Sequence, residues 1–186
     1  SSGAITLTNG SQVVLNRANT GAGINTSQGG RVTIDASTVA TNTALFGGGG
    51  IYATNSNTVI SLTNGSRVQA NRAANGGGIY FDSGAVVAID GSTFLANTAT
   101  TDGGGLLNDG GTLQVTGSSI FSNTAGQNGG GLIVSSGGAV TVTASSILFN
   151  GAANGGALYQ ANGSSDVTAS CIVANSDTAV HYAGGF

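Results

Sequence analysis

The chain has 186 residues, of which 39% are hydrophobic and only 6% are charged, with 34 glycines, no proline and a formal net charge of −3. This hydrophobic fraction excludes the usual intrinsically disordered chain, which stays unfolded because charge and polarity prevent burial. Four scattered arginines without lysine exclude the cation clusters that bind nucleic acids and anionic membranes. No apolar run approaches the roughly 20 residues of a membrane-spanning helix, and the single cysteine, Cys171, excludes an internal disulfide.

The first predicted element is a short strand within residues 3–11, GAITLTNGS, which already has the pattern of one coil of a repeat. From there, asparagines recur in similar surroundings at spacings of 25 to 29 residues. The series consists of Asn16, Asn42, Asn71, Asn97, Asn123, Asn150 and Asn175. The apolar residue that closes each glycine run recurs at spacings of 26 to 28 residues, as Ile24, Ile51, Ile79, Leu106, Leu132 and Leu158. Two independent markers with one period indicate a repeat architecture.

Each asparagine is preceded by a serine at five residues and by an apolar residue at three. The serines are Ser11, Ser37, Ser66, Ser92, Ser118, Ser145 and Ser170. The apolar residues are Val13, Val39, Val68, Phe94, Ile120, Ile147 and Ile172. Upstream of the serines lie alternating segments such as AVVAID at 85–90 and AVTVT at 139–143. Period-two alternation is typical of a half-buried strand.

Each repeat is therefore predicted to contain three short strands, separated by a small-residue corner, an asparagine turn and a glycine corner. Such a unit cannot bury its apolar face alone, but stacked units share a continuous core with like residues above like. We predict an all-β fold, a parallel β-helix or solenoid of about seven coils with about 26 residues per coil, as a single domain over residues 1–186. At about 4.8 Å between strands, the rod would be roughly 30 Å long.

The run NRAANGGGIYF at 71–81 shows one asparagine turn and one glycine corner. Glycine reaches positive φ without steric cost and permits close approach of neighbouring coils. A phosphate-binding loop would occur once, before a helix and with a lysine, so repeated glycine runs without lysine argue against it. The seven asparagines are predicted to form a buried ladder, in which each amide donates to one coil and accepts from the next. The serine hydroxyls are expected to stack in a similar way.

FLAN at 94–97 and GGAL at 155–158 are the clearest copies of two short motifs, FxxN and GGA[ILV]. Relaxed variants such as IFSN, ILFN, GGGI and GGGL extend the pattern over essentially the whole chain. The motifs resemble the repeats of the chlamydial polymorphic outer membrane proteins and of similar large bacterial exoproteins. This resemblance implies a right-handed β-helix, export to the cell surface, and an autotransporter-like adhesive or structural role. It implies no catalytic residues.

Enzyme chemistry has little support among the charged residues. The seven acids are Asp35, Asp82, Asp90, Asp102, Asp109, Asp166 and Asp177. Asp35 and Asp90 fall in one column but two coils apart, about 10 Å, too far for a shared proton or one cation. Asp102 and Asp109 flank a glycine corner, but no arginine falls near them in the repeat, and the lone His181 has no paired carboxylate or nucleophile. We therefore expect no catalytic, cofactor-binding or metal-binding residues, with a polysaccharide lyase or hydrolase as one alternative.

Tyr52 and Tyr80 follow Ile51 and Ile79 in adjacent coils, so their rings are predicted to stack. An outward aromatic strip would hold sugar rings, which makes the two tyrosines candidate ligand contacts and a carbohydrate-binding module a second alternative. Aromatic residues stacked within the core are the other interpretation of the same spacing.

Neither 3–11 nor the last coil-like segment, CIVANSDTAVHYAGGF, carries the cap or charge cluster that normally covers the open edge of a solenoid. Two interpretations stay open: the chain is cut from a longer surface protein, or copies of it stack end to end into a filament. The sequence thus predicts a non-enzymatic, extracellular structural or adhesive solenoid of the bacterial cell surface. Its expected partners are other copies of itself and host or environmental glycans, and not nucleic acid or membrane.

Overall fold

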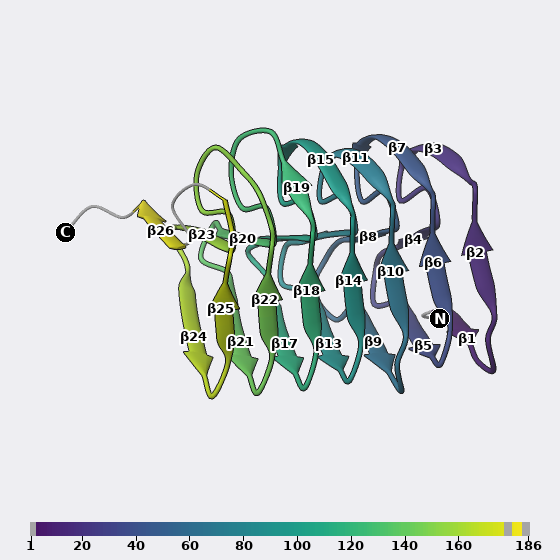
Figure 1. Ribbon diagram of the computed structural model, residues 1–186. Coiled ribbons are helices and arrows are strands. Elements are labelled where there is room, and N and C mark those ends of the chain that lie inside the picture. The colour runs from purple at the N-terminus through teal and green to yellow at the C-terminus, as the bar shows by residue number, and fades with distance from the viewer. Residues whose placement is uncertain (1–2, 177–179, 184–186) are drawn as a thin grey trace.

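The computed structural model describes residues 3–176 and 180–183, and the regular elements in these residues are all β-strands. The strands of the described residues form four parallel sheets, A to D, which the chain visits in this order in the first five coils; sheet C has five strands and the other three sheets have seven each. Figure 1 shows the resulting rod, with the strands of successive coils side by side. The rod has about six turns of about 27 residues, so the predicted parallel solenoid is confirmed. Among the described residues, no helix is long and apolar enough to cross a membrane.

Sheets A and B hold the two strands that flank each serine. Sheet A consists of β1 (Ala4–Leu7), β5 (Arg31–Asp35), β9 (Val59–Thr63), β13 (Val86–Asp90), β17 (Thr112–Thr116), β21 (Ala139–Thr143) and β24 (Ser164–Thr168). Sheet B consists of β2 (Gln12–Val14), β6 (Thr38–Ala40), β10 (Arg67–Gln69), β14 (Thr93–Leu95), β18 (Ser119–Phe121), β22 (Ser146–Leu148) and β25 (Cys171–Val173). In β13, Val87 and Ile89 are buried whereas Val86 and Asp90 are exposed, so alternation gives the strand one core face.

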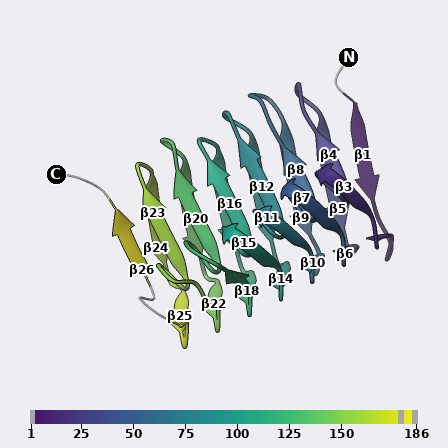
Figure 2. The same ribbon diagram turned by 90° about the horizontal axis from the view of Figure 1, so that it is seen from above.

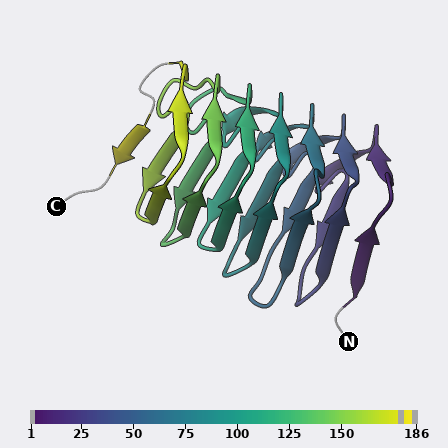
Figure 3. The same cartoon turned by 60° about the horizontal axis from the view of Figure 1, so that its bottom comes forward.

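Sheet D follows the glycine corners. It consists of β4 (Ile24–Thr26), β8 (Ile51–Ala53), β12 (Ile79–Asp82), β16 (Leu106–Asp109), β20 (Leu132–Ser135), β23 (Leu158–Ala161) and β26 (Val180–Ala183). Figures 2 and 3 show from two further directions that its strands lie beside their counterparts in adjacent coils.

Sheet C lies between the asparagine turns and the glycine corners, and the prediction of three strands per coil is wrong because it omits this sheet. Its strands are β3 (Arg17–Thr20), β7 (Thr43–Gly47), β11 (Arg72–Asn75), β15 (Thr98–Asp102) and β19 (Thr124–Ala125). In β11 only Ala73 is buried. One small apolar residue per strand gives too weak an alternation to be recognised in the sequence.

The core consists of apolar side chains stacked in register along the rod. Val68 of sheet B pairs with Val39 on one side and Phe94 on the other, and all three are buried. In sheet D, Ile79 pairs with Leu106 and both are fully buried. Like residues therefore lie above like, and each coil covers the apolar surface of its neighbours.

The asparagine side chains form a hydrogen-bonded ladder. Asn71 Nδ2 donates to Asn97 Oδ1 and to the carbonyl oxygen of Val39, both at 3.0 Å, and Asn71 Oδ1 accepts from the backbone N and Nδ2 of Asn42. The ladder runs through Asn16, Asn42, Asn71, Asn97, Asn123, Asn150 and Asn175. In the described part of the chain, no buried side-chain nitrogen or oxygen lacks a hydrogen-bond partner. The amides are therefore compatible with a dry interior.

The serines form a second ladder at the corner between sheets A and B. The backbone N of Ser92 donates to Ser118 Oγ at 3.0 Å, and that of Ser118 donates to Ser145 Oγ at 3.1 Å. The residue before each serine has a positive φ, for example 54° at Gly91 and 49° at Ala144. The hydroxyls thus satisfy backbone donors at a corner where the chain leaves the strand conformation.

The glycine runs turn the chain from sheet C into sheet D and let the coils approach. Gly76 has a φ of 57°, which glycine adopts without steric cost. A Cβ on Gly77 would lie 2.5 Å from the carbonyl oxygen of Thr98 and 2.6 Å from that of Gly104, both backbone atoms of the next coil. Both roles that the sequence assigned to these glycines are therefore present.

Candidate functional site

The outward side chains of sheet D include the stacked tyrosine pair. Tyr52 and Tyr80 are opposite each other in β8 and β12, half-buried, with ring centroids 5.1 Å apart and ring planes tilted by 47°. Their neighbours Ile51 and Ile79 point into the core, so alternation sends the rings outward. The alternative of stacked core aromatics is therefore wrong for this pair.

The same column continues along the rod in register. Tyr80 is followed by Leu107, Ile133 and Tyr159 on the next three strands of sheet D. Leu107 and Ile133 are only 7% and 6% exposed, although strand alternation turns them away from the core. We call Tyr52, Tyr80, Leu107, Ile133 and Tyr159 the floor column.

One side of the floor column is lined by polar residues that directly precede the glycine corners, and two of them, Asn75 and Asp102, end strands of sheet C. Asn75, Asp102, Asn128 and Asn154 are paired in register across successive coils. The backbone N and Nδ2 of Asn128 donate to Asp102 Oδ1 at 3.1 and 2.9 Å, and Asn154 Nδ2 donates to Asn128 Oδ1 at 3.0 Å. We call these four residues the amide column.

The other side is lined by the last residues of the sheet D strands. Asp82, Asp109 and Ser135 are paired in register and form what we call the acid column. The hydroxyl of Tyr52 donates to Asp82 Oδ2 at 3.2 Å, and the hydroxyl of Tyr80 donates to Asp109 Oδ2 at 3.3 Å. Tyr52 and Tyr80 are thus each hydrogen-bonded to an aspartate of the next coil, and this bond fixes the position of the ring in the floor column.

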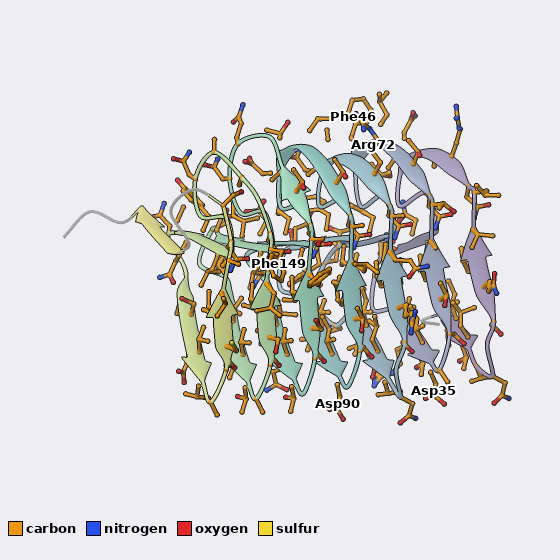
Figure 4. The ribbon with its side chains drawn as sticks, in the orientation of Figure 1. Asp35, Phe46, Arg72, Asp90 and Phe149 are labelled. Atoms are coloured by element: carbon orange, nitrogen blue, oxygen red, sulfur yellow. The ribbon has the colours of Figure 1, made fainter. Side chains whose placement is uncertain are left out.

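Two adjoining cavities lie over these columns, and together we call them the groove. The first has a volume of about 150 Å³ and is lined by Thr20, Phe46, Gly47, Tyr52, Asn75 and Tyr80. The second has a volume of about 360 Å³, shares Asn75 and Tyr80 with the first, and reaches Tyr159 between the amide and acid columns. Because its residues come from successive coils, the groove runs along the rod. Figure 4 labels Phe46 at the upper edge of the molecule.

Glycines make the groove concave. A Cβ on Gly47 would lie 2.9 Å from Cδ1 of Tyr80. A Cβ on Gly76 would lie 2.6 Å from Cβ of Tyr80, and one on Gly103 would lie 2.8 Å from Cβ of Leu107. The glycine corners therefore leave the space that bulkier residues would take from the floor column.

The surroundings of Tyr52 and Tyr80 favour the neutral form of both phenols. Burial raises the pKa of Tyr80 above its ordinary value, and the nearby carboxylates of Asp109 and Asp82 raise it further. Burial likewise raises the pKa of Tyr52, with Asp82 as the next largest cause. Both hydroxyls therefore stay protonated and donate to the acid column over the ordinary pH range.

We expect the phenols of Tyr52 and Tyr80 to titrate above 10.0, the ordinary pKa of tyrosine. Because the pKa in the folded state exceeds that in the unfolded state, stability is unaffected below about pH 10 and falls as the pH rises further. Phenolate absorbance and urea unfolding, measured from pH 8 upward, test both statements. The Tyr80→Phe variant should lose part of the alkaline decrease in stability; an unchanged decrease would contradict the assignment.

Other acids singled out in the sequence lie outside the groove. Asp35 and Asp90 project from separate coils at the lower edge in Figure 4, with Thr63 between them in the sheet, and Thr63 Oγ1 donates to Asp35 Oδ1 at 3.0 Å. No group of three or more His, Cys, Asp or Glu side chains that could hold a metal ion occurs among the described residues. Asp177 and the side chain of His181 lie outside those residues.

Sequence reasoning found the tyrosines but missed most of the groove. Asp102 and Asp109, which flank one glycine corner in the sequence, both line the larger cavity. The amide column was missed because its members, Asn75, Asp102 and Asn128, differ from coil to coil. The sequence did contain a sign of this column, because each of its members lies at the same distance before the glycine run that follows it.

Comparison with known proteins identifies the family of the chain. A protein-family model described as "right handed beta helix region" matches residues 20–186, which include the whole groove. Comparisons with curated proteins and with solved structures give no match.

Proposed function

Because the chain belongs to the family of right-handed β-helix proteins, we propose that it is a non-enzymatic, extracellular solenoid of the bacterial cell surface with a structural or adhesive role. In this proposal the groove binds an extended carbohydrate chain lying along the rod. The resemblance of FLAN at 94–97 and GGAL at 155–158 to the chlamydial repeats supports the surface location.

The observation that carries this proposal is the floor column between two polar columns. Half-buried rings at Tyr52, Tyr80 and Tyr159 offer apolar faces to sugar rings. The amides of Asn75 and Asn128 and the carboxylate of Asp109 offer hydrogen-bond donors and acceptors to hydroxyl groups. Ligand sites typically combine an apolar surface with a few fixed polar groups in this way.

The absence of enzymatic activity in this proposal rests on how the carboxylates are engaged. Asp109 accepts from Tyr80 and from Ser135, the latter at 2.9 Å, while Asp102 accepts twice from Asn128. Both carboxylates are thus held in place by neighbouring side chains, as expected of groups that position a ligand. If incubation with polysaccharides released new reducing ends, and Asp109→Asn abolished the release, the lyase or hydrolase alternative would replace the proposal.

We expect Tyr80→Ala to weaken the binding of neutral and amino-sugar hexasaccharides about tenfold, since loss of a central aromatic contact costs roughly 1.4 kcal/mol or more. Isothermal titration calorimetry with the hexamers of glucose, N-acetylglucosamine and glucosamine measures this. Tyr80→Phe, which keeps the ring, should retain most of the affinity.

Phe149→Ala is the matched control for loss of an exposed ring. Phe149 is 56% exposed and packs against Phe121, with ring centroids 5.4 Å apart, and neither lines the groove. An equal loss of affinity in Phe149→Ala and Tyr80→Ala would place binding elsewhere, and no binding of any hexasaccharide would overturn the proposed function.

End-to-end assembly stays a hypothesis beside this proposal. Ile5 and Leu15 of the first described coil are 41% and 77% exposed, which is apolar surface that a second copy would cover. Sedimentation at several protein concentrations distinguishes a monomer from a growing filament.

A further inference from the structure

The groove carries an unbalanced charge, and from it we propose that the groove selects glycans with positively charged amino groups, such as glucosamine polymers, over uronic acid polymers. This inference rests on the proposed function, since it names the ligand class of the same site. It concerns the charge of the ligand and not the stacking on the floor column.

The negative charges gather beside Tyr80 and Leu107 of the floor column. Asp82, Asp102 and Asp109 come from three neighbouring strands around Tyr80. Asp102 and Asp109 face each other across the larger cavity, one in the amide column and one in the acid column. A ligand lying on Leu107 would therefore have a carboxylate on each side.

No positive charge among the described lining residues offsets these carboxylates. Neither cavity is lined by an arginine, and the sequence contains no lysine. Arg72 is the arginine nearest in sequence to the amide column, but it is exposed and begins β11 whereas Asn75 ends it.

The carboxylates keep acceptor capacity for a cationic ligand. A carboxylate has about four lone-pair sites. Asp109 uses two of them, one for Tyr80 and one for Ser135, and Asp102 binds Asn128 through Oδ1. An ammonium group has three donors and forms charge-assisted hydrogen bonds with such oxygens, which are stronger than neutral ones.

A chain of uronic acids would be repelled by the groove, because its charges have the same sign as those of the aspartates. Its carboxylates would approach Asp102 and Asp109, which line the larger cavity, in a partly desolvated groove where like charges repel more strongly than in bulk water. Charge complementarity therefore separates the two classes of glycan.

The test compares hexamers of glucosamine, N-acetylglucosamine and galacturonic acid by calorimetry, at a pH where glucosamine is protonated. We expect the glucosamine hexamer to bind about tenfold more tightly than the N-acetylglucosamine hexamer. Salt at 0.5 M should reduce this preference. The galacturonate hexamer should bind more weakly than both. Asp109→Asn and Asp102→Asn should each reduce the preference several-fold.

Asp90→Asn is the matched control, because it removes the same charge from the exposed outer face of sheet A. It should leave the preference unchanged. Equal affinity for the glucosamine and N-acetylglucosamine hexamers would overturn this inference and leave the proposed function intact, whereas no hexamer binding would overturn both. Hexalysine binding as tightly as the glucosamine hexamer would also overturn it, since the groove would then attract any cation. The wild-type comparison decides the matter even if a variant fails to fold.

Discussion

Gly77→Ala is expected to destabilise the rod by at least about 3 kcal/mol, because its new methyl group has no space between two coils. The ideal Cβ position lies 2.5 Å from the carbonyl oxygen of Thr98 and 2.6 Å from that of Gly104. Both atoms are backbone, so no side chain can rotate away and the coils themselves must separate. Urea unfolding followed by circular dichroism measures the change, and failure of the variant to accumulate as folded protein is the same result in stronger form.

Gly91→Ala is the control for this substitution. Gly91 has a φ of 54°, and an added Cβ would have no atom within 4 Å. The equivalent corners of other coils already hold Ala36 and Ala144, with φ of 46° and 49°. We expect a cost of about 1 kcal/mol from the left-handed conformation alone. If both variants lost similar stability, close coil-to-coil approach would not explain the glycine runs.

Asn97→Ala is expected to cost about 3–5 kcal/mol, because it leaves several buried polar groups without partners. Asn97 Nδ2 donates to the carbonyl oxygen of Val68 at 2.8 Å and to Asn123 Oδ1 at 2.9 Å, and its Oδ1 accepts twice from Asn71 at 3.0 Å. Alanine supplies none of these bonds, and its small side chain leaves a cavity in their place. The free energy of unfolding in urea measures the loss.

Asn154→Ala removes an asparagine from the amide column instead of the ladder. Asn154 is exposed and its side chain donates to Asn128 at 3.0 Å. Water replaces that bond, so we expect a change within about 0.5 kcal/mol. A nearly neutral Asn97→Ala, or a cost equal to that of Asn154→Ala, would show that burial of the ladder does not stabilise the fold.

The periodic part of the fold could be predicted because burial leaves little choice at certain positions. A buried amide needs a partner in both neighbouring coils, so asparagine recurs at Asn71, Asn97 and Asn123 and sets the coil length. A close contact between coils admits only glycine at positions such as Gly77. The repeat therefore predicted the stacking of the coils and the asparagine ladder.

Sheet C and the groove could not be predicted because neither depends on one repeated residue. A strand such as β11 buries a single alanine, Ala73, and gives no clear alternation. The groove combines residues from three columns, and its positions are exposed enough to tolerate Asn75 in one coil and Asp102 in the next. Tyr52 and Tyr80 were recognisable because two large rings fell at equivalent positions.

The vertical equivalence of the coils has a consequence for how such a gene can change. Tandem duplication of one coil would set every copied side chain beneath its original and lengthen the rod by about 4.8 Å. An insertion of one residue inside a strand would instead turn the core side chains outward. Natural variants of this chain should therefore differ in length by whole coils. The groove should become longer as the number of coils increases.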